Sequence, residues 1–317
     1  MKYFRTFLYI LTLFGVCVFL YLKRDDIHYL VEIHYTKLLL LFAAGLITVI
    51  FNAFLFKNTI SIFDLNLPFK EWFGLTITNT MYNYLLPARG GIALRALYMK
   101  NNYRFSYSQY ISLTAGTYII SLFTAAFFAT ALSIIIFLIQ KANNIAFLYI
   151  SFSLLIVISG LLFVLYHFNP QRIAEKNKIF KFLKNIAIGL KQFKEKRNKV
   201  FKIMLIQMGL ILAMSLRLFI AYMAIDILSV NFTKLVFINS LVAFSMVFSI
   251  TPGNIGIKEG IIGLSYTLLD ISFDQAILGA LLDRLVTIII VFVLGLVFSN
   301  FLIREIKYKK TNIEFNE

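Results

Sequence analysis

Long apolar runs, separated by short polar segments, dominate this chain and predict its elements. A helix needs about 20 apolar residues to cross the hydrocarbon core of a bilayer, which is about 30 Å thick. Six runs are long enough, and they cover residues 5–22, 38–56, 108–140, 145–167, 203–225 and 275–303. The pattern predicts an all-α fold, a polytopic membrane helical bundle with about six full spans.

Two further apolar segments stop at helix-breaking residues. They cover 71–86 and 235–250, and they run into the sequences LLPARGG and SITPGNIG. Proline lacks a backbone donor and glycine frees the backbone to turn, so each break ends one helix and starts another. The amphipathic pieces that follow, 92–99 and 257–269, are too short to cross a bilayer at about 1.5 Å per residue. We therefore expect two re-entrant hairpins of broken helices.

The basic residues predict the orientation in the membrane. The segment 168–202 carries eleven Lys and Arg residues, and a second basic group follows the last span at Arg304, Lys307, Lys309 and Lys310. Basic loops favour the cytoplasmic side. Both groups face the cytoplasm if each broken segment enters and leaves the membrane on the same side. If the broken segments crossed the membrane completely, either the basic loop or the basic tail would lie outside the cell. We expect a multi-pass protein of the bacterial inner (plasma) membrane, with cytoplasmic N- and C-termini and an uncleaved first span.

The two breaks align with each other along the sequence. Identical residues recur at an offset of 165 or 166, in the pairs Pro87/Pro252, Gly91/Gly256, Ile92/Ile257, Ser106/Ser272, Gln109/Gln275 and Ile111/Ile277. In the expected topology the two hairpins enter from opposite sides, which makes an inverted repeat whose broken helices meet near the midplane. A chance alignment of two helix breaks is the alternative. The chain then consists of a single transmembrane domain, 1–310, and a short tail, 311–317. The domain contains two leading spans (1–57), a first repeat (69–140), the basic loop (168–202) and a second repeat (232–303).

The breaks are candidate anion sites. Irregular backbone at membrane depth is tolerated only against protein or a water-filled cavity. The start of each half-helix presents unpaired N–H groups and a positive dipole, and nearby basic residues add fixed charge. We expect a lipid phosphate to bind here, as part of a membrane phospholipid or a polyprenyl-phosphate lipid. The candidate head-group residues are Arg89, Gly90, Gly91, Arg95, Gly253, Gly256, Lys258, Glu259 and Arg284, with Pro87 and Pro252 as the helix breaks.

Three charged residues lie inside the apolar runs and need partners. Arg217 and Asp283 fall at similar expected heights in their spans, so we predict that they pair. Arg284, adjacent to Asp283, faces another direction on its helix, and Glu259 is its expected partner. An unpaired charge at the bilayer centre costs about 2.5–3.5 kcal/mol on insertion scales. These pairs either lock helices together or line the substrate path, and the sequence favours neither.

The basic loop has apolar residues at helical spacing. Ile179, Leu183, Ile186, Leu190 and Phe193 alternate with lysines, which is typical of an amphipathic helix held at the inner surface by anionic lipids. A solvated loop that only sets topology is the alternative. The net charge of +16 follows from the positive-inside distribution, so nucleic acid is not an expected partner.

Other chemistry is not expected. The lone cysteine excludes an internal disulfide, the three histidines have no metal-ligand spacing, and there is no phosphate-binding loop of the G-x-x-x-x-G-K-[ST] type. No catalytic residue, metal or cofactor is predicted.

Over most of its length the sequence resembles the lysylphosphatidylglycerol synthase transmembrane-region family, the flippase-like integral membrane proteins. LLPARGGIALRALYM in the first half, and TPGNIGIKEG with LLDRL in the second, carry the resemblance. The family pattern of a Pro, a Gly pair and a following Arg falls on Pro87, Gly90, Gly91 and Arg95. Family members often have an acidic residue after the Gly pair, where this chain has Ile92.

The resemblance implies a lipid translocase that moves an anionic or phosphate-bearing lipid between leaflets. Aminoacyl-transferring members carry a soluble catalytic domain after the membrane part, so a chain that stops at Glu317 is expected to lack aminoacylation chemistry. One alternative is an integral membrane transferase acting on a lipid head group, with Glu259 or Asp283 as general base. Another is a noncatalytic subunit of an envelope-lipid synthesis complex, working with a separate lipid-modifying enzyme. The oligomeric state stays open.

Overall fold

The computed structural model describes residues 33–86, 89–140, 145–167, 171, 177–245 and 251–314. Every regular element in these ranges is a helix, so the all-α prediction is confirmed. The expected first span, 5–22, and the break residue Pro87 lie outside the described residues.

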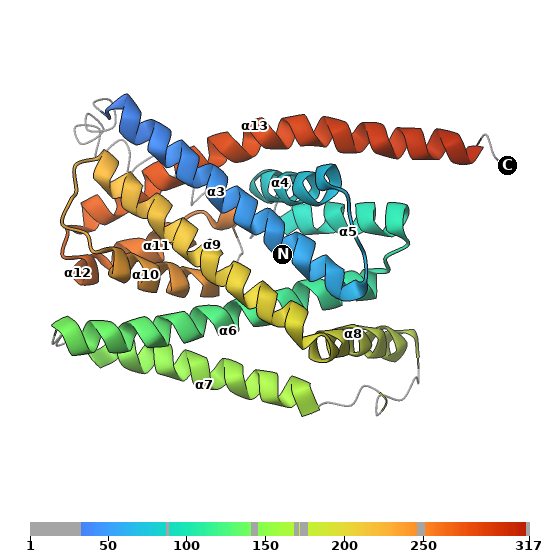
Figure 1. The fold of residues 1–317 in the computed structure, drawn as a ribbon, viewed down its shortest axis with the longest axis horizontal. Helices are drawn as coiled ribbons and strands as arrows, with labels where there is room; N and C mark the ends of the chain where they lie inside the picture. Colours follow the sequence, from blue (N-terminus) through green and yellow to red (C-terminus); the bar gives the residue numbers. More distant parts are fainter. Residues whose placement is uncertain are drawn as a thin grey trace.

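Five long helices form the bundle: α3 (Tyr35–Ile60), α6 (Tyr107–Gln140), α7 (Ile145–His167), α9 (Arg197–Ala224) and α13 (Phe273–Glu314). In Figure 1, α6, α7 and α13 run along the long axis of the molecule, while α3 and α9 cross it obliquely. All but α7 contain an apolar stretch long enough to span a membrane, and α7 has a shorter one at Leu148–Val164. Because α13 continues to Glu314, the helix includes part of the segment expected to be a tail from residue 311.

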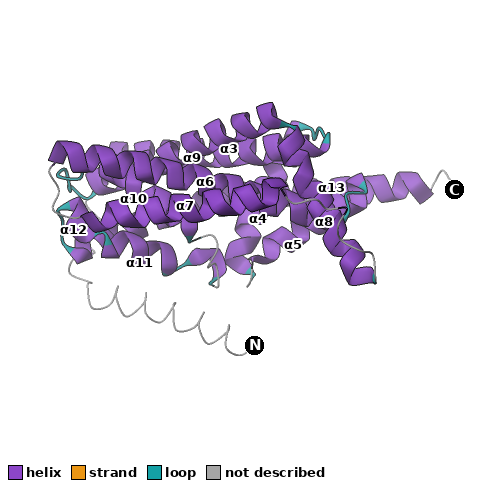
Figure 2. Ribbon diagram, turned by 90° about the horizontal axis from the view of Figure 1, so that it is seen from below, coloured by secondary structure: helices purple, strands orange, loops and turns teal. Residues whose placement is uncertain are grey.

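The two broken segments lie toward opposite ends of this long axis. In Figures 1 and 2, α4 (Phe69–Leu85) and α5 (Gly90–Tyr103) lie toward one end, and α10 (Phe232–Phe244) and its successors lie toward the other. After α10 come η4 (Pro252–Asn254), α11 (Ile257–Leu264) and α12 (Tyr266–Leu269). The single short helix expected at 257–269 is therefore two helices, because the chain departs from helical geometry at Ser265.

The two breaks have matching backbone conformations at two aligned positions. Leu86 and Thr251, 165 residues apart, are both extended, with φ/ψ of −110°/138° and −85°/148°. Arg89 and Asn254, again 165 residues apart, are both left-handed, with φ of 56° and 59°. Positive φ is uncommon for residues other than glycine, so the two breaks correspond at these positions. They differ directly afterwards, because Gly90 already belongs to α5 whereas Ile255 is extended.

The turns that close the two broken segments also match. Arg104 and Asp270 are both left-handed, 166 residues apart. A reciprocal cap then starts each long helix. Ser106 N donates to Gln109 Oε1 (2.9 Å) and Gln109 N donates to Ser106 Oγ (3.3 Å); the same bonds join Ser272 and Gln275 at 3.0 and 3.2 Å. This capping box satisfies amides at the helix start, and it places α6 and α13 equivalently after the two broken segments.

The helices of the two halves pack across each other. Helix α3 packs against α9, α4 packs against α13, and α10 packs against α6. If α3–α6 are taken as the first half and α9–α13 as the second, the second helix of each half (α4 or α10) contacts the last helix of the other half (α13 or α6). Helix α7 packs against α6, and Ser133 Oγ on α6 is 2.9 Å from Ser151 Oγ on α7. Helix α8 (Lys178–Glu195) packs against the first turns of α6. The helices that pack across the two halves enclose a cavity between them.

Candidate functional site

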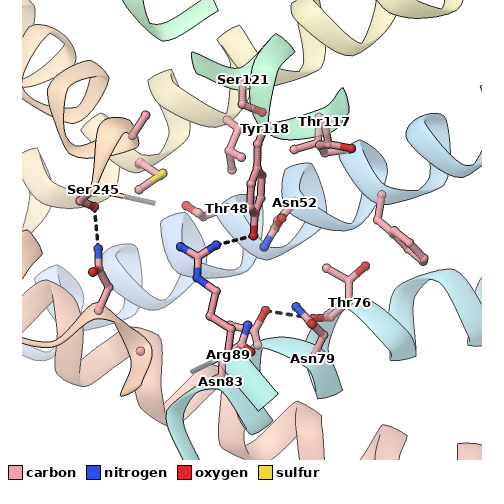
Figure 3. Close-up of a pocket in the computed structure, with 18 of the residues that line it drawn as sticks. Thr48, Asn52, Thr76, Asn79, Asn83, Arg89, Thr117, Tyr118, Ser121 and Ser245 are labelled. Atoms are coloured by element: carbon pink, nitrogen blue, oxygen red, sulfur yellow. Dashed lines mark hydrogen bonds between the residues drawn. The ribbon is translucent and has the colours of Figure 1, made fainter. Parts of the chain in front are cut away.

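A cavity of about 350 Å³ lies between the two halves. Residues of α3, α4, α5, α6, α9, α10, α11 and α13 line it, together with the second break, and Figure 3 shows part of this lining. Five of the lining side chains are basic and none is acidic: Arg89, Arg95, Arg217, Lys258 and Arg284. The structure thus brings four of the expected head-group side chains to one cavity, and adds Arg217.

Two stripes of polar residues form much of the remaining wall. Helix α4 contributes one stripe and α6 the other, and both follow the spacing i, i+3, i+4, i+7: Thr76, Asn79, Thr80, Asn83 and Thr114, Thr117, Tyr118, Ser121. Residues at this spacing lie on one face of a helix. Neither stripe was predicted from the sequence, although polar residues at helical spacing within apolar runs are a signal for such a lining.

Tyrosines of α6 orient the two arginines of the first broken segment. Arg89 Nη1 donates to Tyr118 Oη, and the guanidinium carbon is 5.3 Å from the centre of that ring (Figure 3). Arg95 Nε donates to Tyr110 Oη at 2.6 Å, and its guanidinium lies 4.2 Å from the centre of the Phe56 ring. These contacts hold both cations at the cavity wall.

Asp283 is the acidic centre of a buried ion network. Arg217 donates to it twice, from Nε to Oδ1 (2.5 Å) and from Nη2 to Oδ2 (3.1 Å). Lys258 Nζ is 2.6 Å from Asp283 Oδ2. The structure therefore contains the pair that the sequence analysis expected and adds Lys258 as a second cation. Lys258 both lines the cavity and binds the protein's own carboxylate.

Arg284 ties α13 to the second break. Its Nε donates to Glu259, its Nη1 to Gly253 O (2.7 Å) and its Nη2 to Asn254 O (3.3 Å). Glu259 Oε2 in turn accepts from Gly256 N at 2.8 Å. The carboxylate of Glu259 thus occupies the start of α11, where the helix dipole favours an anion. Gly256 and Glu259 are not among the lining residues and belong to the structure behind the cavity wall.

The expected glycines have different roles. Gly253, with φ of 59°, lines the cavity and lies directly against the ring of Tyr84. Gly90 and Gly91 do not line it. Gly91 N donates to Asn83 Oδ1 (3.1 Å), and a side chain at Gly91 would collide with the carbonyl of Asn79 on α4. Gly91 therefore permits the close packing of α5 on α4. Pro252 is buried at the second break.

The charges around the cavity do not cancel. Five lining cations and the two carboxylates behind them, Asp283 and Glu259, leave a formal excess of three positive charges. Three buried amide oxygens of lining residues have no hydrogen-bond partner within the described part of the chain: Asn79 Oδ1, Asn239 Oδ1 and Asn254 Oδ1. The cavity suits an anion that also carries hydroxyl donors, or water that bridges to one. The described residues contain no group of three His, Cys, Asp or Glu side chains placed to bind a metal.

Comparison with protein families matches residues 7–295 to the lysylphosphatidylglycerol synthase TM region. The chain belongs to the lysylphosphatidylglycerol synthase TM region family. This confirms the resemblance noted from the two glycine-containing motifs, and with the four apolar helices it makes the chain an integral membrane protein. In this member of the synthase TM family, Ile92 follows the first Gly pair and lines the cavity beside Arg89 and Arg95. A search of curated proteins returned no significant match.

Proposed function

We propose that the protein is a lipid translocase, which moves an anionic or phosphate-bearing lipid between leaflets with the head group held in the central cavity. The observation that carries this proposal is the lining itself, with five basic and no acidic side chains. A phosphate is stabilised by charge-assisted hydrogen bonds from Arg and Lys. The excess of positive charge favours an anionic head group over one that bears an additional ammonium group, such as a lysyl lipid.

We further propose that the two broken segments are re-entrant hairpins of an inverted repeat. The matched turns and caps support two equivalent halves, and the positions of α4–α5 and α10–α12 toward opposite ends support entry from opposite sides. Rocking of one half against the other would open the cavity to each leaflet in turn.

Charge supports an orientation for this repeat. The end of the molecule with α5 and α8 is rich in exposed basic residues, among them Lys57, Lys70, Lys100 and Arg104. At the other end, Lys37 pairs with Asp226 and Lys234 pairs with Asp270. We place the α8 end in the cytoplasm of a bacterium, with both termini on that side and the bundle in the plasma membrane.

The transferase alternative is less well supported by the geometry. A general base needs a carboxylate that is free to take a proton from the substrate. Asp283 instead accepts bonds from two cations, and Glu259 accepts from Arg284 and from the amide of Gly256. Both carboxylates are therefore held in structural contacts.

Two measurements test the proposal. In proteoliposomes with labelled lipid in both leaflets, a quencher in the outer aqueous phase should reach the phosphatidylglycerol or polyprenyl phosphate of both leaflets. A lysyl-bearing lipid of the inner leaflet should stay protected. Rates equal to those of protein-free liposomes for every anionic lipid would reject translocation. Native mass spectrometry of the purified protein should show a retained phosphate-bearing lipid that Arg284→Ala loses. Appearance of a covalently altered lipid that depends on Glu259 would favour the transferase.

A further inference from the structure

Helix α8 carries an apolar stripe that the protein covers over only half its length. Ile179, Leu183, Ile186, Leu190 and Phe193 share one face by their helical spacing. The later residues of this stripe meet α6, whereas the earlier ones extend past it. The two halves of α8 therefore have different surroundings, although the sequence pattern is continuous.

The second half of α8 is docked. Ser112 Oγ on α6 donates to Ile186 O at 2.9 Å, and Gly189 lies against Ser112 with no space for a side chain. Phe193 is buried against Gly116 of α6, and its ring centre is 6.1 Å from that of Phe63. These contacts fix the position of α8 relative to a membrane-spanning helix.

The first half of α8 projects a bare apolar surface. Ile179 is 67% exposed, Leu183 47% and Phe182 40%, so a large part of each apolar side chain is accessible. The helix is nevertheless well started, because Asn177 Oδ1 accepts from Ile179 N (3.1 Å) and Phe180 N (3.0 Å). Large apolar side chains held outward on a capped helix indicate a surface that binds an apolar partner.

The charge around this surface indicates which partner. Lys178, Lys181 and Lys184 lie in the same two turns, and no acidic residue occurs between Asn177 and Lys194. Figure 2 shows α8 inclined to the long helices, at the end of the bundle where α5 also lies. Helix α8 is docked near the start of α6, which is long and apolar enough to span a membrane. A helix docked at the end of a membrane span is expected at the depth of the head groups. An apolar stripe flanked by lysines complements anionic head groups above acyl chains.

We propose that the first half of α8 lies in the membrane–water interface and binds anionic phospholipid, with Ile179, Phe182 and Leu183 in the acyl boundary and the lysines at the head groups. This surface is separate from the central cavity, so it binds lipid that is not being moved. The lipids that it contacts belong to the leaflet at the α8 end of the molecule.

The test uses the full chain in nanodiscs that hold one copy each, which excludes coverage by a second copy. After Cys17→Ala, an environment-sensitive fluorophore is attached at Leu183→Cys or, as a matched control on the opposite face, at Lys181→Cys. In discs with about one-third phosphatidylglycerol, the label at 183 should be blue-shifted and protected from a water-soluble quencher, and the label at 181 should be quenched. Equal quenching at both positions would overturn the proposal.

A second pair of variants tests the charge requirement without changing the apolar stripe. With the label at 183, the combined change Lys178→Gln and Lys181→Gln should lower the ratio of protected to quenched label about fivefold for each lysine removed, since each is worth about 1 kcal/mol at an anionic surface. Lys191→Gln, on the docked half, should change it much less. Protection that is the same in purely phosphatidylcholine discs and insensitive to both lysines would overturn the assignment to anionic lipid.

Discussion

Arg217 on α9 and Asp283 on α13 form a buried ion pair, in which the two side chains are 4% and 0% exposed and Nε is 2.5 Å from Oδ1. Lys258 on α11 adds a second cation to the same carboxylate at 2.6 Å. One acidic group thus joins three helices beside the cavity. A buried charge is tolerated when it is paired, and the removal of one partner leaves the others uncompensated.

Replacing Asp283 by Asn should therefore destabilise the protein strongly. Two cations would lose their counter-charge in a water-poor environment, and breaking a buried pair in this way costs about 3–5 kcal/mol. The free energy of unfolding is measured by reversible unfolding in detergent or bicelles, with intrinsic fluorescence as the readout.

The matched control is Asp226→Asn. Asp226 also pairs with a cation, Lys37, but its side chain is 78% exposed. Asn tolerates the left-handed backbone of that position, and an exposed pair contributes only about 0–1 kcal/mol. Equal losses for the two variants would show that burial of Asp283 does not increase the stability lost when its charge is removed.

Arg284→Lys should loosen the second break. A lysine keeps the charge but cannot reproduce the fork that reaches Glu259, Gly253 O and Asn254 O together. Hydrogen exchange of residues 251–257 should accelerate, because the carbonyls of Gly253 and Asn254 lose their donors. Arg95→Lys is the control, since Arg95 contacts Tyr110 and Phe56 instead. Unchanged exchange in Arg284→Lys would show that other contacts hold the break.

Gly253→Ala should destabilise the break by a different route. The left-handed conformation costs alanine about 1–2 kcal/mol, and its methyl group would meet the ring of Tyr84. Gly160→Ala on α7 is the comparison, because a side chain there meets nothing within 4 Å. That change should be neutral or slightly stabilising, since alanine is the better helix former. A smaller loss at Gly253 than at Gly160, measured by thermal unfolding, would contradict the geometry.

Four of the six expected apolar helices, α3, α6, α9 and α13, have the length to span a membrane, and they could be predicted because an apolar run of sufficient length has few other structures available. The pairing of Arg217 with Asp283 could also be predicted, since a charge inside a spanning helix needs an opposite charge at similar depth. Both inferences use only position along a helix. They required no knowledge of how the helices are arranged around the cavity.

The other contacts of the site depend on that arrangement. Lys258 was expected at the lipid head group, and its bond to Asp283 depends on where the second break places α11. Tyr118 gave no sequence signal as the partner of Arg89, because the contact joins a loop residue to the middle of α6. The backbone amides at the start of α11 were expected to be unpaired, but Gly256 N donates to the carboxylate of Glu259, one turn further along the chain. Each of these contacts is set by tertiary packing rather than by local pattern.

Asp64 should titrate at a lower pH than an ordinary aspartate. It lies just after η1 (Ser61–Phe63), and the hydrogen bond from Lys196, with help from Lys199, lowers the pKa of its carboxyl. A depressed pKa means that the contact is present above the ordinary value and is lost as the pH falls through the folded-state value. Carbon NMR of labelled aspartates in nanodiscs should show the low midpoint, and Lys196→Gln should raise it. A midpoint unmoved by Lys196→Gln would contradict the assigned cause.

Loss of a cavity cation should slow lipid movement more than loss of a surface cation. Arg89 lines the cavity at the start of α5, where Tyr118 orients it. A hydrogen bond to a charged group contributes about 1.5–3 kcal/mol, so Arg89→Gln should reduce the rate for phosphatidylglycerol in proteoliposomes by about tenfold or more. Lys202→Gln removes the same charge from an exposed position on α9 and should leave the rate within about twofold. Parallel unfolding measurements separate a loss of transport from a loss of folded protein. Equal rates in Arg89→Gln and Lys202→Gln, with both folded, would remove Arg89 from the lipid path, because a head group that passes through the cavity must come close to this side chain.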